Sequence, residues 1–349
     1  MTNREPPQGG TGASVGTAGS PVRPAAMPTT ERADPFLPVR DASSRPPSGS
    51  SESASLDPAT ISVGRGEAPE HLFRRLLGAY LGGAREFTIL ERSPISTRTR
   101  EVVRSFCRRT RQPEIISDEG GTLRLRDLAF ESPIPVEQRI ERMGRLVIDF
   151  HREAVESWSR LPFLDDGYWQ HRDDEIDRDA WYVERVAAIQ LGATGHGPEW
   201  LGLWTTARSL ERIADHAVVL GEVGRRLGDL PSGAGSFTSL RQFHRQAMEH
   251  LEGVLEAEDD ASANDLLDLG EALQASGRTL ADRLLPEVGG GTMPPPAAAA
   301  VTRILESIGR TIAYAQDIAE VVLDASVPRA ETDVRASVRR VAPVPVLSL

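Results

Sequence analysis

Residues 208–222, RSLERIADHAVVLGE, belong to a longer stretch in which small and apolar residues recur every three or four positions. This alternation is typical of a narrow contact stripe along one α-helix of a bundle. Because most residues of the stripe are alanine or glycine, we expect a neighbouring helix to approach closely. The stripe consists of Leu203, Ala207, Leu210, Ala214, Ala217 and Gly221.

Five further segments between residues 136 and 325 show a similar helical periodicity. The breaks between segments contain residues that interrupt helices, most clearly at Pro162, at the Gly-His-Gly-Pro run 195–198 and in the loop 231–235. The expected helices span residues 137–162, 165–194, 198–229, 236–259, 262–285 and 296–324.

The third and sixth segments resemble each other, because residues 303–320 read RILESIGRTIAYAQDIAE. Aligning the Leu-Glu pair at 210–211 with the pair at 305–306 also matches two further apolar positions. We therefore expect two tandem three-helix bundles, residues 136–230 and 236–325, rather than a single six-helix bundle. The matched apolar pairs are Ile213 with Ile308 and Ala217 with Ile312.

A small β-α-β-α-β-β module is expected before the helices, over residues 59–132. ATISV (59–63) and REFTILE (85–91) have the composition and alternation of strands. One helix is expected from Pro69 to the Gly82-Gly83 pair, and a second over 96–112. Residues 114–128, EIISDEGGTLRLRDL, predict a hairpin that turns at Gly120-Gly121. The fold class is therefore mainly α with a small α/β module.

Both ends of the chain lack this patterning. Residues 1–58 are rich in Pro, Gly, Ser, Thr and Ala, and they contain one aromatic residue, Phe36. Such a segment buries too little apolar surface to offset the entropy lost on ordering, so we expect a disordered tail. Residues 326–349 are interrupted by Pro and are expected to be a flexible C-terminal tail.

Composition excludes several classes of protein. The 349 residues carry a net charge of −11, all 40 basic residues are Arg, and Cys107 is the one cysteine. A chain without Lys has no lysine for a P-loop, and one cysteine forms neither an intrachain disulfide nor a thiolate metal cluster. No apolar run reaches the length of a membrane helix, and the start MTNREPPQGG has no apolar signal core. We expect a cytoplasmic protein that is not inserted in a membrane and has little affinity for nucleic acid.

Two pairs of acids are spaced four residues apart: Asp173 with Asp177, and Glu211 with Asp215. Residues at this spacing lie on one face of a helix, where two like charges repel. If the two helices are neighbours, the four carboxylates converge on one surface. An all-oxygen site suits divalent ions such as Mg²⁺, Ca²⁺ or Mn²⁺, or iron when a histidine is added.

A solvated charged face is the alternative interpretation of the same spacing. Acids in the first turns of a helix interact favourably with its dipole, which accounts for the Asp173–Asp177 pair. On the other helix, Glu211 can pair with Arg208 and Asp215 with Arg212.

A run of arginines in the second module helix is another candidate for binding, because a basic helix can bind phosphate or nucleic acid. The exposed face of a module helix accounts for the run equally simply, and no interleaved aromatic residues support base stacking. The run consists of Arg98, Arg100, Arg104, Arg108, Arg109 and Arg111.

Residues 172–186, RDDEIDRDAWYVERV, followed by 209–222, SLERIADHAVVLGE, resemble the PhoU family of phosphate-uptake regulators. The preceding stretch is similar to archaeal PhoU-type proteins, in which a small α/β module precedes the helices. The resemblance implies two three-helix bundles, a homodimer, and negative regulation of phosphate uptake through contact with a phosphate transporter ATPase or a sensor protein. It implies a regulator, not an enzyme. The implied metal ligands are Asp173, Asp177, Glu211 and Asp215, with Arg212 and His216 as nearby partners, and the ion is divalent or iron-type.

The chain also departs from the family pattern. Archaeal relatives often begin with a DNA-binding swapped hairpin of the AbrB type, for which residues 1–58 show no strand pattern. In the second bundle, Arg310 stands where a second acid would follow Glu306, so we expect one metal site in the first bundle and degenerate motifs in the second. The alternative functions are a metal-dependent phosphohydrolase using the same carboxylates and a transcriptional regulator acting through the Arg-rich helix.

Overall fold

The protein is described by a computed structural model over residues 58–92, 94–110, 112–128, 135–159, 167–194, 197–227, 234–289 and 295–326. The described chain is mainly helical, with a small four-stranded sheet before the helical region, which confirms the predicted fold class. The tails expected at 1–58 and 326–349 lie outside the described residues, apart from one boundary residue each.

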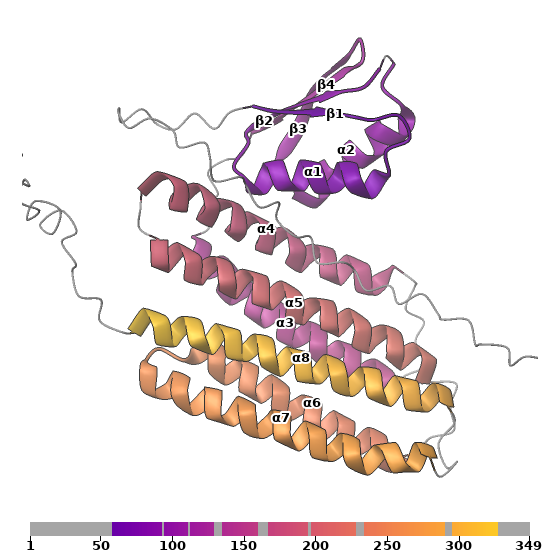
Figure 1. Ribbon diagram of the computed structural model, residues 1–349, viewed down its shortest axis with the longest axis vertical. Helices are drawn as coiled ribbons and strands as arrows, with labels where there is room; N and C mark the ends of the chain where they lie inside the picture. Colours follow the sequence, from indigo (N-terminus) through magenta and orange to yellow (C-terminus); the bar gives the residue numbers. More distant parts are fainter. Residues whose placement is uncertain are drawn as a thin grey trace, which may run out of the picture. The chain divides into compact units, whose positions relative to one another are not determined.

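The α/β module follows the predicted order. Its sheet has the strand order β1-β2-β4-β3, in which β1 is parallel to β2 and the other neighbours are antiparallel. Helices α1 and α2 lie on one face of the sheet (Figure 1) and close a core that contains Leu76, Phe87 and Phe106. The elements are β1 (Ala59–Ser62), α1 (Pro69–Leu81), β2 (Glu86–Leu90), α2 (Thr97–Thr110), β3 (Pro113–Glu119) and β4 (Thr122–Asp127).

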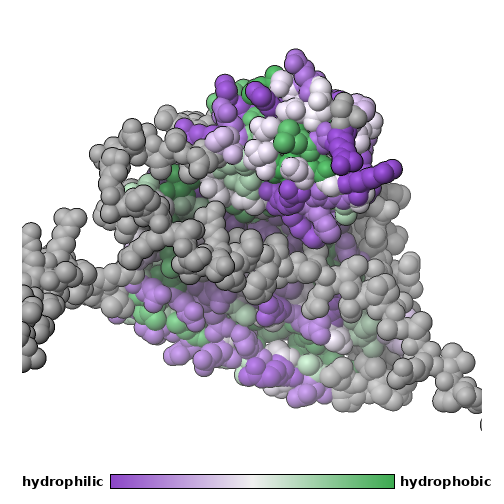
Figure 2. Space-filling view, turned by 45° about the horizontal axis from the view of Figure 1, so that its top comes forward, coloured by the Kyte–Doolittle hydropathy of each residue, from purple (hydrophilic) through white to green (hydrophobic). Residues whose placement is uncertain are grey.

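The β3–β4 hairpin turns where the sequence predicts. Gly120 and Gly121 have φ angles of 56° and 84°, a left-handed conformation that glycine adopts without strain. On the outer face of the sheet, Arg124 and Arg126 are exposed between the buried leucines of β4. Figure 2 shows hydrophilic and neutral residues around smaller hydrophobic patches on the module side that it displays. Strands β2 and β3 also expose Leu90, Ile115 and Ile116, so the exposed surface of the sheet mixes polar and apolar side chains.

Six long helices follow, close to the predicted ranges, and run alongside one another (Figure 1). No helix in the described ranges is both long enough and apolar enough to cross a membrane. The helices are α3 (Val136–Glu156, followed by a short 3-10 turn, Ser157–Ser159), α4 (Tyr168–Thr194), α5 (Gly197–Leu227), α6 (Ala234–Glu256), α7 (Asp260–Gly289) and α8 (Pro295–Ser326).

Helices α3, α4 and α5 pack as one group and α6, α7 and α8 as another, and α5 lies against α8 between them. The two groups share one hydrophobic core. The apolar positions that match in the internal repeat, Ile213 with Ile308 and Ala217 with Ile312, are all fully buried. The repeat therefore records equivalent core positions on two neighbouring helices.

The small-residue stripe of α5 allows the close packing that its composition predicts. Ala207, Ala214 and Ala217 are completely buried. A Cβ atom added at Gly221 would lie 2.4–2.7 Å from ring atoms of Trp169, so glycine is required for that ring to reach α5.

Candidate functional site: the acidic face of α4 and α5

Helix α4 carries four acids that are at most 5% exposed, although acidic side chains are seldom buried without a partner. Asp173 and Asp177 belong to the predicted motif, whereas Asp179 and Glu184 do not. Three of them, Asp177, Asp179 and Glu184, contact arginines from other helices, as described below. Burial of α4 therefore depends on arginines supplied by its neighbours.

Arg109, at the end of α2, bridges the α/β module to α4. One terminal nitrogen donates a hydrogen bond to Oδ2 of Asp177 at 2.7 Å and lies 2.7 Å from Oδ1 of Asp174. The guanidinium carbon also lies 5.0 Å from the ring centre of Phe73 and 4.9 Å from that of Trp181. Two carboxylates and two aromatic rings therefore surround one cation.

A second arginine fixes the same interface from the opposite direction. Arg185 of α4 is buried in the module, where it donates to the carbonyl oxygens of Tyr80 and Ala84 and forms a 3.0 Å ion pair with Asp127 of β4. Its guanidinium carbon lies 4.4 Å from the ring centre of Tyr80. Because a buried charge without its partners is costly, these contacts hold the module on α4.

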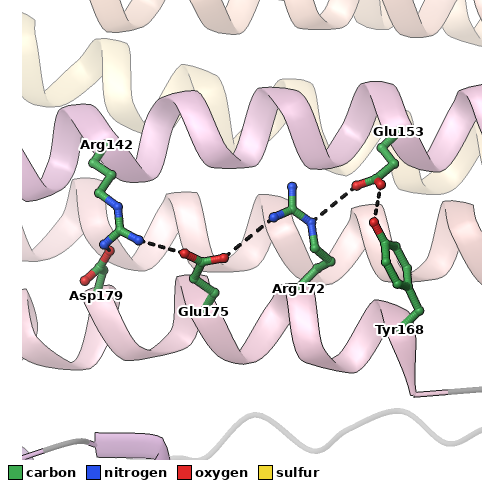
Figure 3. A network of polar contacts seen from close by, with 6 residues as sticks. All are labelled: Arg142, Glu153, Tyr168, Arg172, Glu175 and Asp179. Atoms are coloured by element: carbon green, nitrogen blue, oxygen red, sulfur yellow. Dashed lines mark hydrogen bonds and ion pairs between the residues drawn. The ribbon is translucent and has the colours of Figure 1, made fainter.

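A ladder of alternating charges joins α3 to α4 (Figure 3). Arg142 of α3 donates to Asp179 at 2.8 Å and to Glu175 at 2.7 Å, and Arg139 donates to Asp179 at 2.7 Å. Arg172 of α4 continues the ladder to Glu153 of α3 and lies 3.6 Å from Glu175. At its end Tyr168 donates to Glu153. This ladder sets the register of the two helices.

The second predicted acid pair lies on α5, which packs against α4. Arg212 lies 3.5 Å from a carboxylate oxygen of Glu211 and 3.7 Å from one of Asp215, between the two acids. Burial raises the pKa of Glu211 well above its ordinary value, and the charges of Asp215 and Asp177 raise it further. The two motifs therefore lie on neighbouring helices, and the charge of Asp177 is among those that act on Glu211.

Arg208, which the alternative interpretation assigns to Glu211, lies 3.6 Å from Glu184 of α4. Burial raises the pKa of Glu184, and the charge of Arg208 opposes that shift. His216 points elsewhere: its ring stacks on Tyr314 of α8, with ring centres 6.0 Å apart. Burial lowers its pKa to about 4, which favours the neutral imidazole.

A bound metal ion requires several ligand side chains that converge on one point. Over the described ranges, no group of three or more His, Cys, Asp or Glu side chains could hold a metal ion. Asp177 is instead bonded to Arg109, and Arg212 lies between Glu211 and Asp215. Arginine charge thus occupies the places where the acidic spacing predicts a cation, and the residues as arranged do not fit one.

Sequence reasoning placed the predicted acids on neighbouring helices and paired Asp215 with Arg212, which lies 3.7 Å away, but it missed Arg109 as the partner of Asp177. Arg109 was interpreted only as a member of the basic run. Of the other arginines in that run, Arg98, Arg104 and Arg108 are exposed and Arg100 forms a 2.6 Å ion pair with Asp118. The last one, Arg111, lies outside the described residues. The sequence of α4 did contain a signal of this contact with the module. Polar and aromatic residues recur there at steps of three and four, which places them on one face of the helix: Asp174, Asp177, Trp181 and Arg185.

Cys107 packs against the module core, as expected of a small apolar residue on a helix, and burial raises its pKa to about 11.

Comparison with known families finds one match that covers this face. Residues 140–223 match the family described as the PhoU domain, a segment that runs from α3 through α5 and contains both acidic motifs. No curated protein matches the chain. The first helical unit thus carries a PhoU domain, which supports a place in the family of phosphate regulators.

Proposed function

We propose that this protein is a cytoplasmic regulator of phosphate homeostasis that restrains phosphate uptake by contacting a phosphate transporter ATPase or its sensor. The match of residues 140–223 to the PhoU domain carries the proposal. The α/β module before the helices also agrees with the archaeal-type proteins that the sequence resembles. A homodimer is part of the proposal through the same resemblance.

The contacts of α4 support a binding protein rather than a hydrolase. Asp179 is bonded to Arg139 and Arg142, and Asp177 to Arg109. A carboxylate held by one or two guanidinium groups is fixed in place, which suits a rigid docking surface. A general acid or base must instead exchange a proton with its substrate.

Phosphate uptake in the source organism tests the proposal. Deleting the gene is expected to leave uptake high when phosphate is plentiful, and the wild-type gene should restore restraint. Affinity purification from phosphate-replete cells should recover the transporter ATPase or the sensor. Unchanged uptake together with recovery of neither protein would overturn the proposal. Hydrolysis of small phosphoesters with Mn²⁺, lost in Asp177→Asn, would replace it with a metal-dependent phosphohydrolase.

Cation binding by Asp173, Asp177, Glu211 and Asp215 is a narrower proposal, and it requires Arg109 and Arg212 to move away from these carboxylates first. Its support is the family spacing and the concentration of negative charge around Glu211. We expect Asp215→Ala to abolish whatever stoichiometric metal the purified protein carries and to leave its helical content unchanged. Equal metal loading in mutant and wild type, measured by mass spectrometry of the elements, would remove this part of the proposal.

A further inference from the structure

The surroundings of Arg109 are those of a bound cation rather than of an exposed surface arginine. Asp174 and Asp177 each approach one guanidinium nitrogen to 2.7 Å. Phe73 of α1 and Trp181 of α4 present their rings to the same group at about 5 Å. Asp177 is 5% exposed, so its charge requires compensation close by.

The position of this cation matters because Asp177 also acts on α5. Its negative charge is among those that raise the pKa of Glu211. Because α4 packs against α5, the guanidinium bonded to Asp177 lies at the interface between the helices that carry the two acidic motifs. In the described part of the chain, no group of three or more His, Cys, Asp or Glu side chains could hold a metal ion, and Asp177 is bonded to Arg109.

We propose that Arg109 is a tethered cation: its guanidinium takes the place of a metal ion at Asp177, and the α/β module thereby covers the acidic face of α4. Arg185, bonded to Ala84 and Asp127, keeps the module beside α4. Arg109 therefore stays close to Asp177 even when the bond between them is broken, which gives it a high effective concentration there. A free ion must displace it to reach Asp177, and its apparent affinity falls by the fraction of molecules in which Arg109 has left.

Titration with Mn²⁺ alone tests this competition in the full-length protein. Arg109→Gln removes the charge, and its affinity for Mn²⁺ is expected to rise on the order of tenfold or more. Arg108→Gln is the matched control, because Arg108 is the exposed preceding residue of the same helix and the variant has the same net charge. We expect Arg108→Gln to bind Mn²⁺ as the wild type does. Equal affinity in Arg109→Gln and Arg108→Gln would overturn the proposal.

Two further variants separate charge from packing. Arg109→Lys keeps the positive charge but loses the planar group between the rings, and we expect its Mn²⁺ affinity to stay near that of the wild type. A gain in Arg109→Lys as large as in Arg109→Gln would contradict a role for the charge. Adding Asp177→Asn to Arg109→Gln should remove the gained affinity, and a double variant that keeps it would place the ion elsewhere.

Hydrogen exchange gives a second readout that needs no metal. If Arg109 holds the α/β module against α4, backbone amides of α2 should exchange faster in Arg109→Gln than in Arg108→Gln. Those of the core helices α5 and α8 should stay protected in both variants. Unchanged exchange in α2 would refute the covering role even if Mn²⁺ affinity rises. Neither measurement depends on phosphate uptake, so failure of the proposed function and failure of this inference are distinguishable.

Discussion

Arg109 of the module and Asp177 of the PhoU domain lie 68 residues apart in the chain and are joined by a 2.7 Å hydrogen bond between oppositely charged groups. The contact links the module to the acidic motif on which the functional assignment depends. It also changes the meaning of that motif, because an acid already bonded to a guanidinium is no longer an open ligand for an ion. The state of the α/β module and the chemistry of the acidic face are therefore coupled.

Replacing Arg185 tests how firmly the module is held. Arg185→Met removes the buried cation that pairs with Asp127 and is expected to cost about 3–5 kcal/mol, measured by urea unfolding and by faster hydrogen exchange in α1. The matched control is Arg126→Gln, which breaks an exposed pair with Glu86 and should cost about 0–1 kcal/mol. Equal effects of the two changes would show that the buried pair does not hold the module.

Gly221 tests the close packing of α5. A Cβ atom there would collide with the ring of Trp169, so Gly221→Ala is expected to destabilise the fold by about 1–3 kcal/mol. Gly309→Ala in α8 is the control, because a Cβ atom there meets nothing within 4 Å. That change should be neutral or stabilise by about 0.5–1 kcal/mol through higher helix propensity. Thermal unfolding of both variants distinguishes crowding from propensity, and a stabilised Gly221→Ala would contradict the packing argument.

Local patterns were enough to predict most of the fold. The Pro69 start of α1, the paired glycines of the β3–β4 turn and the stripe on α5 each depend on neighbours within a few residues. Such features can be predicted from the sequence because helices and hairpins depend on local backbone preferences and on the spacing at which apolar residues recur.

The candidate site was predictable only in part, and the missing part is long-range. Spacing placed Asp177 and Glu211 on two helices, α4 and α5, that pack against each other in the structure. Which arginine would neutralise Asp177 depended on how α2 packs against α4, and no local pattern encodes that docking. Trp181 belongs to the module core, so part of the docking surface was visible as an aromatic residue on a polar face of α4.

Two buried histidines predict how stability depends on pH. His151 of α3 donates through Nε2 to the carbonyl oxygen of Ile213 at 2.7 Å, since a carbonyl only accepts, and its Nδ1 lies 3.3 Å from Nε2 of His244 in α6. Burial lowers the pKa of His151 from 6.5 to about 4, and that of His244 also falls through burial. His216 on α5 is the third titratable group nearby.

The sign follows from proton uptake. Between pH 6.5 and about 4 the unfolded chain binds protons that folded His151 does not, so stability is present above pH 6.5 and is lost as the pH falls towards 4. The loss is expected to be about 1.4 kcal/mol per pH unit for this histidine. Thermal unfolding across this range should show a flatter profile for His151→Gln, whereas exposed His71→Gln should retain the wild-type slope. Identical slopes in all three proteins would exclude this histidine as the cause.

The melting temperature of the wild type and that of Arg109→Gln should respond differently to removal of metal. Because Arg109 rather than an ion neutralises Asp177, treating wild-type protein with EDTA is expected to leave its melting temperature unchanged. Arg109→Gln should be stabilised by added Mn²⁺, by about 2.7 kcal/mol at a concentration one hundred times the dissociation constant, since the ion binds the folded state. EDTA should reverse that gain. A wild-type melting temperature that falls in EDTA and recovers with Mn²⁺ would show that an ion, and not the guanidinium, holds the acidic face.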